Sequence, residues 1–511
     1  MSSTSESIFG KKILVTAYDL EQSEHRGIAV YTKALIHCLR RAGAEVWLLT
    51  EVQSLKNSDL TNAPTLTRDL VRNVRILDSL AYGQKEQPQP YLLRRLGLAG
   101  PIRLSKKTIE LIVDFSRRPR RFSQKSLHKF RLDQLFDNPY PRVERMRYLQ
   151  DLKGIVCAPK LFFSSQIAAR LPLRKPVQID LRGFDILLTS CPLNLDPQHI
   201  PTFVQTIHDL IPLEFVAHNE DATMFSNRLL ACLPARKLFV SHSTATKFNR
   251  HISQFHGKGY IEPRQSVIIQ PPSLHFPQWI TADPENICDL KPVTHLLCDD
   301  NPYAETFNEI SPSGKPLRRR NKQMHPFRYL LFNSSVEARK NLLFLSQAYA
   351  ESGLSSLGIQ LCVTGKLKGD LYSKAVKDIV QHEPGILLTG YVDESTKLDL
   401  YLNALGLVSP SLVEGFGIPV LDGACLGMPT IASDCESHLE IQALQDFKNS
   451  VITLDTLKTR NWAAAMQAVA GLNSDLWKNA AEERKRRIGR YEKLRIGFYD
   501  QLQADLEEIL N

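Results

Sequence analysis

The stretch that decides the fold is residues 414–433, EGFGIPVLDGACLGMPTIAS. The apolar run 405–409 lies shortly before it and has the length of a buried strand. Pro419 suits the first turn of a helix because proline has no amide hydrogen to donate there. Gly427 ends this helix, and Thr430–Ser433 has the composition of the next strand. The order strand, glycine loop, helix and strand predicts one βαβ unit of a parallel sheet.

Two carboxylates lie in this unit, Glu414 in the loop and Asp422 in the first turn of the predicted helix. Open α/β sheets bind ligands at the carboxyl ends of their strands, so both acids are expected to face one crevice. The helix dipole alone also favours an acid near a helix N-terminus, which explains Asp422 without a ligand. The dipole does not explain Glu414, whose neighbouring glycines let a ligand approach the backbone.

Strand patterns alternate with helical patterns in two regions of the chain. We expect strands at 11–18, 45–49, 184–190, 202–207, 237–241 and 266–270 in the first region, and at 327–333, 358–365, 385–392, 406–411 and 430–433 in the second. This alternation predicts an α/β protein with two doubly wound, Rossmann-like domains facing a cleft. The predicted parts are a domain at 11–281 with a basic insertion at about 51–180, an irregular linker at 282–325, a second domain at 326–474 and long amphipathic helices at 475–511.

The composition is that of a folded protein in a reducing compartment. The nine cysteines are scattered without a C-x-x-C pair, so neither a disulfide framework nor a zinc site is indicated. The first residues, MSSTSESIFGKK, lack the apolar stretch of a signal peptide, and no apolar run reaches transmembrane length. We therefore expect a soluble, cytoplasmic protein.

The formal net charge of +10 is concentrated in residues 94–131. This segment carries twelve Lys and Arg residues against only Glu110 and Asp114, so it accounts for the whole excess. Aliphatic and aromatic residues are interleaved with the cations. A solvated surface insertion and a peripheral contact with the anionic inner face of a membrane both fit this composition. Nucleic acid fits least, because the sequence has no zinc-finger or RRM signature.

A cation pair, Arg339 and Lys340, is expected at the start of the first helix of the second region. Cations there oppose the helix dipole, and a bound anion would resolve this conflict. The fork of an arginine beside the point charge of a lysine suits a diphosphate, although a solvated basic pair is the plain alternative. Carboxylates accept hydrogen bonds from hydroxyls. A ligand with a diphosphate and several hydroxyls is a nucleotide-sugar.

At this point the sequence resembles the family 4 retaining glycosyltransferases of the GT-B fold, glycosyltransferase group 1 type. The resemblance covers most of the chain outside the two insertions. It is carried by RGIAVYTKAL (26–35), TIHDLIPL (206–213), FVSHSTATKF (239–248), EARKN (337–341) and LTGYVDESTKLDLYLNALGLVSPSLVEGFGIPVLDGACLGMPTIASD (388–434). As a set these motifs are highly specific, whereas any one of them alone is weak.

The resemblance implies a role for each matching residue. Glu414 would contact the transferred sugar, and Arg339 and Lys340 would hold the donor diphosphate. Asp422 matches a family glutamate that faces the nucleotide ribose, but it is one methylene shorter. The remaining donor-binding positions are Gly27, near the diphosphate, and Gly415, Phe416 and Gly417, whose amides would lie against the sugar. Ala29 stands where many relatives have a second glycine.

His208 and Asp209 follow an expected strand end and are predicted to face the cleft. By resemblance His208 contacts the reacting sugar, although a lone histidine is more often structural. The retaining reaction then uses either a covalent carboxylate or a front-face route. The sequence offers no separate nucleophile, which favours the front-face route. It also lacks Asp-x-Asp, so we expect no metal and no cofactor besides the nucleotide-sugar co-substrate.

The sequence leaves the donor nucleotide, the sugar and the acceptor open. We expect transfer to a glycan, a lipid-linked glycan or a small molecule, as in polysaccharide biosynthesis. A catalytically weak GT-B scaffold that only binds a nucleotide-sugar or glycan is the alternative, because Asp422 and Ala29 depart from the family pattern.

Overall fold

The computed structural model describes most of the chain. The described residues are 8–22, 25, 27–52, 64–83, 121–135, 144–170, 175–215, 221–255, 263–277, 280–281, 293–297, 318–322, 324–365, 367, 370–444, 447–473 and 475–511. They form two compact units. Unit 1 comprises Met1–Leu213, His218–Pro271 and Tyr499–Asn511, and unit 2 comprises Glu214–Ala217 and Pro272–Phe498. Residues 94–120 of the basic segment lie outside the described part.

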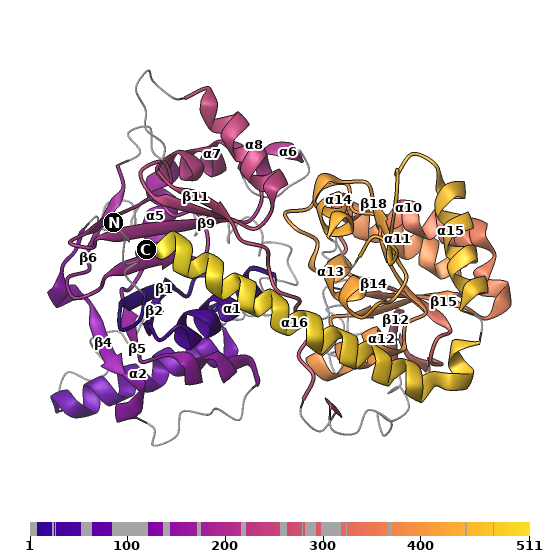
Figure 1. The fold of residues 1–511 in the computed structure, drawn as a ribbon, viewed down its shortest axis with the longest axis horizontal. Coiled ribbons are helices and arrows are strands. Elements are labelled where there is room, and N and C mark those ends of the chain that lie inside the picture. The colour runs from indigo at the N-terminus through magenta and orange to yellow at the C-terminus, as the bar shows by residue number, and fades with distance from the viewer. Residues whose placement is uncertain are drawn as a thin grey trace, which may run out of the picture. The chain divides into compact units, whose positions relative to one another are not determined.

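Unit 1 is built on a sheet of order β11-β10-β9-β7-β1-β2-β5-β4 (Figure 1). Its strands are β1 (Lys12–Thr16), β2 (Glu45–Thr50), β4 (His128–Arg131), β5 (Gly154–Cys157), β7 (Ile186–Thr189), β9 (Thr202–Ile207), β10 (Arg236–Phe239) and β11 (Gln265–Val267). Neighbouring strands pair in parallel except β4 and β5. Most residues of β1 and β2 are buried, as in a sheet covered on both faces, and this explains their nearly continuous apolar sequences.

Helices and a smaller sheet complete unit 1. The helices are α1 (Gly27–Arg41), α2 (Thr65–Tyr82), α5 (Leu161–Arg170), α6 (Ile211–Glu214), α7 (Ala222–Ala231) and α8 (His242–Ser253), and the smaller sheet joins β3 (Arg121–Phe122), β6 (Val177–Asp180) and β8 (Leu195–Gln198). Among the described residues of unit 1, short 3₁₀ helices lie at Gln124–Ser126, Leu132–Gln134 and Glu144–Asp151.

The expected insertion at about 51–180 is in part core rather than insertion. Within it, β5 pairs in parallel with β2, and α5 contributes buried residues such as Phe162 to the same core. The sequence reading missed β5 because its four residues follow a long stretch without regular apolar spacing. β4 also lies in this range and pairs with β5, so the interruption of the sheet ends at residue 128.

Unit 2 has a second sheet, of order β16-β15-β14-β17-β18-β19, in which all neighbours pair in parallel. Its strands are β14 (Tyr329–Asn333), β15 (Gln360–Thr364), β16 (Ile386–Gly390), β17 (Gly406–Ser409), β18 (Thr430–Ser433) and β19 (Val451–Leu454). Numbered within the unit, the order is 3-2-1-4-5-6, which is that of a Rossmann sheet. The strand order reverses between β14 and β17, and ligands of such sheets bind at this switch point.

Helices cover this sheet, and its core lies under α10 and α15. The helices are α10 (Leu342–Ser352), α11 (Leu371–His382), α12 (Glu394–Asn403), α13 (Ile418–Cys425), α14 (Glu436–Ala443) and α15 (Thr459–Leu472), with 3₁₀ turns at Ala338–Lys340, Leu354–Leu357 and Leu476–Asn479. The rings of Phe344 and Trp462 meet edge to face at 5.8 Å and join α10 to α15. The predicted linker at 282–325 is not wholly irregular, because β12 (Val293–Leu297) and β13 (Arg318–Lys322) form an antiparallel pair there.

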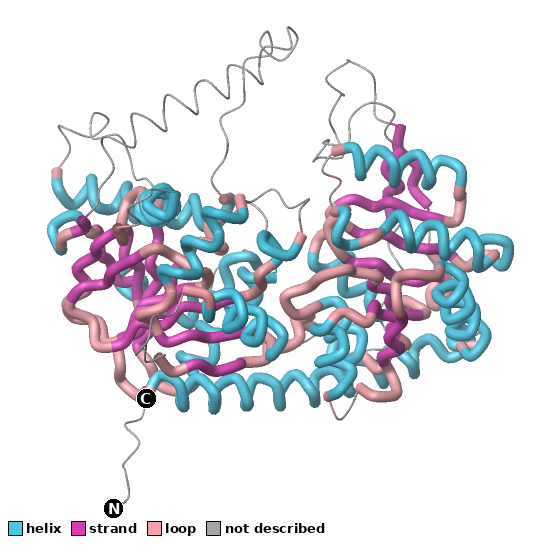
Figure 2. The backbone as a smooth tube through the Cα atoms, turned by 90° about the horizontal axis from the view of Figure 1, so that it is seen from above, coloured by secondary structure: helices cyan, strands magenta, loops and turns pink. Residues whose placement is uncertain are grey.

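The last element is α16 (Ala480–Leu510), a single helix of 31 residues. Figure 2 shows it without interruption. Its residues up to Phe498 belong to unit 2, and those from Tyr499 onward belong to unit 1. Two doubly wound units and this long helix confirm the predicted α/β fold class. In the part of the chain that the structure describes, no helix has the length and apolarity needed to cross a bilayer.

Candidate functional site

The cation pair lies in the loop that follows β14, at the switch point of unit 2. Arg339 and Lys340 belong to a 3₁₀ turn, and Asn341 then takes up a left-handed conformation with φ 56°. The helix α10 begins only at Leu342. The pair therefore precedes the helix in a tight turn of its own, whereas the sequence placed it in the helix start.

The loop after β17 brings Glu414 to these cations. Lys340 Nζ donates to Glu414 Oε1, and Arg339 Nη1 lies 3.2 Å from Glu414 Oε2. The amide of Leu412 donates to the carbonyl oxygen of Arg339 over 2.8 Å, which fastens the two loops together. Since β14 and β17 are neighbours in the sheet, the structure brings together three residues that the sequence analysis assigned to one ligand.

A second carboxylate, Glu337, was not predicted. Its Oε2 lies 3.0 Å from Arg339 Nε, and its Oε1 accepts a hydrogen bond from Ser335 Oγ over 3.0 Å. Two carboxylates thus balance two cations, so the expected conflict with the helix dipole is met by these acids and needs no bound anion. The acid two positions before the arginine in EARKN was the available signal.

The carboxylate of Glu414 is held in its ionised form. Burial alone raises its pKa, but the charges of Lys340 and Arg339 outweigh burial, and the pKa falls to about 2. Burial lowers the pKa of Lys340, and the charge of Glu414 opposes that shift. Both side chains of the pair are nearly buried, with 8% and 10% exposed. The cluster is a desolvated set of compensated charges, which interact more strongly than they would in water.

The glycine loop leads from Glu414 into α13. Gly417 has φ 103°, and a Cβ atom there would lie 2.7 Å from Cδ2 of His438. Glycine is therefore required at this position both by conformation and by space. Gly415 is half-buried and Phe416 is buried, so the loop packs its aromatic side chain inward.

Asp422 does not share an open crevice with Glu414, and this corrects the sequence-based expectation. It lies beyond the first turn of α13 and is 1% exposed. Its Oδ1 accepts hydrogen bonds from the Ser273 amide and from Tyr491 Oη, each over 2.7 Å. Its Oδ2 accepts one from Ser273 Oγ over 2.5 Å. Both oxygens are thus occupied by groups of the protein.

The other predicted residues lie in unit 1. Gly27 is the first residue of α1, and its carbonyl oxygen accepts a hydrogen bond from Gln270 Nε2 over 3.5 Å. Asp209 follows β9, and its Oδ1 accepts the amide of Ile211 over 3.1 Å, which starts α6. Gly27 and Asp209 therefore both make hydrogen bonds that stabilise the local structure of unit 1.

His208 also follows β9 and is 9% exposed. Its Nε2 lies 2.9 Å from the carbonyl oxygen of Ser190, and its ring meets that of Tyr31 edge to face at 5.1 Å. Burial lowers its pKa to about 4, so the imidazole is neutral. Since a carbonyl oxygen only accepts, Nε2 carries the proton and Nδ1 is an acceptor.

Asp19 is a further acid that the sequence reading missed. Ser190 Oγ donates to Asp19 Oδ2 over 2.8 Å, so Asp19 and His208 bind the same residue. The three residues follow β1, β7 and β9, which are neighbours in the sheet. Burial raises the pKa of Asp19 to about 7. The acid shortly after the first strand was the signal that could have found it.

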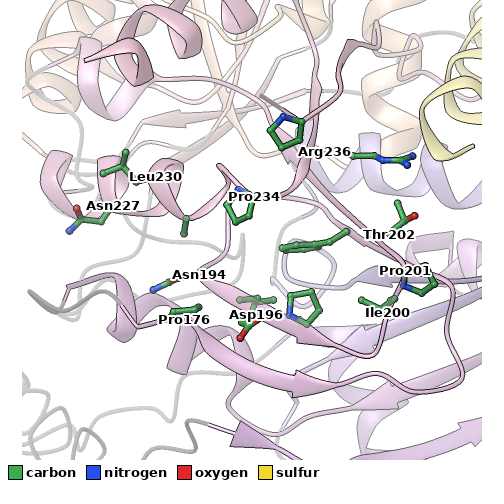
Figure 3. Close-up of a pocket in the computed structure, with 15 residues that line it drawn as sticks. Pro176, Asn194, Asp196, Ile200, Pro201, Thr202, Asn227, Leu230, Pro234 and Arg236 are labelled. Atoms are coloured by element: carbon green, nitrogen blue, oxygen red, sulfur yellow. The ribbon is translucent and has the colours of Figure 1, made fainter. Parts of the chain in front are cut away.

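Unit 1 also contains a cavity of about 600 Å³ (Figure 3). Its lining includes Thr202 and Arg236, the first residues of β9 and β10, together with prolines such as Pro201 and Pro234. It therefore lies at the amino ends of these strands, at the opposite edge from His208. None of the predicted site residues lines it.

Within the described residues, no group of three or more His, Cys, Asp and Glu side chains is arranged to hold a metal ion. The positive charges that meet at the switch point of unit 2 are those of Arg339 and Lys340, and the carboxylates of Glu337 and Glu414 pair with them. An anion could bind this cluster by replacing one of the carboxylates.

Residues 328–471 match the family model for Glycosyl transferases group 1. O-antigen chain mannosyltransferase B of Escherichia coli is 30% identical over 116 residues, which cover 22% of this chain and 30% of that protein. The match thus spans less than a third of the mannosyltransferase. The family match contains both loops of the charge cluster.

Solved structures with a similar backbone include the sucrose-phosphate synthase of Thermosynechococcus elongatus, with 14% identity, a TM-score of 0.48, and coverage of 97% of this chain and 98% of that one. The Anabaena protein HepE in complex with UDP has 11% identity, a TM-score of 0.47, and coverage of 98% and 100%. Both TM-scores are below 0.5.

Proposed function

We propose that this protein is a retaining glycosyltransferase that moves a sugar from a nucleoside-diphosphate sugar to a glycan acceptor. The observation that carries the proposal is the meeting of Arg339, Lys340 and Glu414 at the switch point of unit 2. This cluster lies inside the segment that matches the group 1 glycosyltransferases. Its cations suit a diphosphate, and its carboxylate suits sugar hydroxyls.

Donor binding in this proposal is an exchange of partners. In the structure Glu414 contacts both cations with its two oxygens. A diphosphate brings more negative charge to the same place and takes over Arg339 and Lys340. Glu414 is then released to accept hydrogen bonds from the sugar.

The cations also stabilise the leaving group. As the bond between the sugar anomeric carbon and the phosphate oxygen breaks, negative charge grows on the diphosphate beside Arg339 and Lys340. Donors and cations fixed in advance at the site of growing charge lower the barrier most. On the front-face route the acceptor oxygen bonds to the anomeric carbon, and its proton passes to the departing phosphate oxygen.

His208 is the proposed sugar contact of unit 1. Its proton is committed to Ser190, so the lone pair of Nδ1 can accept a hydrogen bond from a sugar hydroxyl. The imidazole acts as a neutral acceptor in this role. A low pKa keeps it so at neutral pH.

A panel of UDP-, GDP- and dTDP-sugars tests the proposal. One of them should raise the melting temperature of the purified protein and release its nucleoside diphosphate in the presence of an acceptor glycan. Because the curated relative is a mannosyltransferase, GDP-mannose and mannose-containing glycans belong in the first panel. If no nucleotide-sugar stabilises the protein at millimolar concentration, the proposal is wrong.

A binding scaffold without turnover is the second candidate. It is favoured by the hydrogen bonds from Ser273 and Tyr491 to Asp422. They engage the acid that would bind the ribose in the family pattern. The same panel separates the two candidates. Stabilisation by a nucleotide-sugar without release of the nucleoside diphosphate, with every acceptor tried, would indicate the scaffold.

A further inference from the structure

Three hydrogen bonds converge on the carboxylate of Asp422, and a fourth extends them. Ser273 donates from its amide and its hydroxyl, and Tyr491 donates from its phenol. The amide of Leu274 in turn donates to Tyr491 Oη over 2.7 Å. The ring of Phe276 meets that of Tyr491 edge to face at 5.3 Å. Asp422 is the centre of this network.

A buried carboxylate is tolerated only where donors replace the water that it has lost. Burial raises the pKa of Asp422, and the hydrogen bonds from Ser273 and Tyr491 oppose that shift. Three of the four lone pairs of the carboxylate are taken and Asp422 is 1% exposed, so a ribose that binds both oxygens of Asp422 would have to displace one of these donors. The displaced hydroxyl or amide would then need another partner inside the protein.

The network joins segments that are far apart in the sequence. Ser273 lies just after Pro272, where the chain enters unit 2 from unit 1. Tyr491 lies on α16, shortly before that helix continues into unit 1 at Tyr499. Asp422 lies on α13, directly after the glycine loop that carries Glu414. All three side chains belong to unit 2.

We propose that Asp422, Ser273 and Tyr491 form an anchor that positions the glycine loop, and that the donor ribose is held by groups other than Asp422. The anchor fixes α13 to the two segments through which the chain passes between the units. Asp422 is therefore a positioning residue. The part of this inference that concerns the donor rests on the proposed function.

The first test compares UDP with 2′-deoxy-UDP, and GDP with 2′-deoxy-GDP, by calorimetry on the full chain. Asp422→Asn should change the dissociation constants of the ribose and deoxyribose forms by the same factor, so that their ratio stays at the wild-type value. A carboxylate that binds the ribose would instead lose its preference, and the ratio would fall toward one. That result would overturn the proposal.

Tyr491→Phe tests the positioning role without touching the acid. It should weaken UDP or GDP and the matching deoxy form equally, because the glycine loop loses its support. Tyr329→Phe is the matched control, since Tyr329 is equally buried and donates to the carbonyl oxygen of Leu400 outside the network. Unchanged binding in Tyr491→Phe, or equal loss in both variants, contradicts the positioning role.

A thermal double-mutant cycle tests the anchor even if no nucleotide binds. Asp422→Asn removes the charge of the acceptor and Tyr491→Phe removes the donor of one hydrogen bond, so the double variant should melt above the temperature given by adding the two single shifts. Asp422→Asn with Tyr329→Phe should be additive. If Asp422→Asn does not fold, Ser273→Ala with Tyr491→Phe replaces it, and additive shifts there count against the anchor. If no nucleotide binds but the two melting-temperature shifts are coupled, the proposed function is wrong and the anchor is supported.

Discussion

Arg339 and Glu414 lie 3.2 Å apart between Nη1 and Oε2, although they come from loops 75 residues apart in the sequence. The cation proposed for the donor is thus neutralised by the carboxylate proposed for the sugar. Each member of the pair sets how strongly the other binds its own part of the ligand. This relationship yields the first prediction.

Glu414→Gln should reduce turnover strongly while nucleoside diphosphate binds at pH 7 at least as tightly as to the wild type. The substitution removes the negative charge that competes with the diphosphate for Arg339 and Lys340. Calorimetry with the nucleoside diphosphate and a steady-state assay measure the two effects. A collapse of diphosphate affinity would place Glu414 on the wrong part of the donor.

Arg339→Ala and Lys340→Ala should each lower kcat/KM by roughly 100- to 200-fold, because one preorganised stabiliser of developing charge contributes on the order of 3 kcal/mol. Lys478→Ala is the control, since Lys478 is a solvent-exposed lysine of unit 2 that pairs with Asp475. Steady-state kinetics with the identified donor measure the effect. Values within about threefold of the wild type for both clamp variants are incompatible with the assignment.

The stability gained from the ion pairs of Glu414 should disappear in acid. The folded protein holds the pKa of Glu414 at about 2, below the ordinary glutamate value of 4.5. A carboxyl whose pKa is lower in the folded than in the unfolded chain stabilises the fold at pH values above its unfolded pKa. This contribution is lost as the pH falls from about 4.5 to about 2. The difference in melting temperature between wild type and Glu414→Gln should shrink across this window. A constant difference would mean that Glu414 is not ionised in the fold.

EDTA should leave activity unchanged, because Arg339 and Lys340 supply the positive charge in the proposed site. The measurement is the initial rate with and without chelator, followed by addition of Mg²⁺ or Mn²⁺. Loss of activity that either ion restores would contradict a clamp made of side chains alone.

The basic segment 94–131 should bind anionic liposomes if it contacts a membrane. Each Lys or Arg near such a surface contributes about 1 kcal/mol, and salt screens the attraction. Co-sedimentation should require anionic lipid, weaken in high salt, and fall when Arg117, Arg118, Arg120 and Arg121 become alanine. Equal binding to neutral liposomes, or binding to neither kind, leaves the solvated insertion as the explanation.

Periodicity and turn residues predicted most of the fold. The strands at 202–207 and 430–433 were placed with their observed bounds, because each is a short apolar run between turn residues. The four residues of β5 were missed, since a run that short becomes a strand only through its pairing with β2. The pairing partner of a strand cannot be predicted from the strand's own residues.

Part of the charge cluster could be predicted from the order of the strands. Arg339, Lys340 and Glu414 each follow a predicted parallel strand, and strand ends meet at one edge of the sheet. The burial of Asp422 could not be foreseen, because its donors Ser273 and Tyr491 come from segments with no local signal for contact with α13.

The helix α16 has a consequence for how the protein is made. Its last turns supply buried side chains, Leu506 and Ile509 among them, to unit 1, and the carbonyl oxygen of Ile509 accepts a hydrogen bond from Arg236 over 2.6 Å. These residues leave the ribosome only after the whole of unit 2. During synthesis, the part of unit 1 that precedes Pro272 therefore lacks the buried side chains of these last turns until unit 2 has been made.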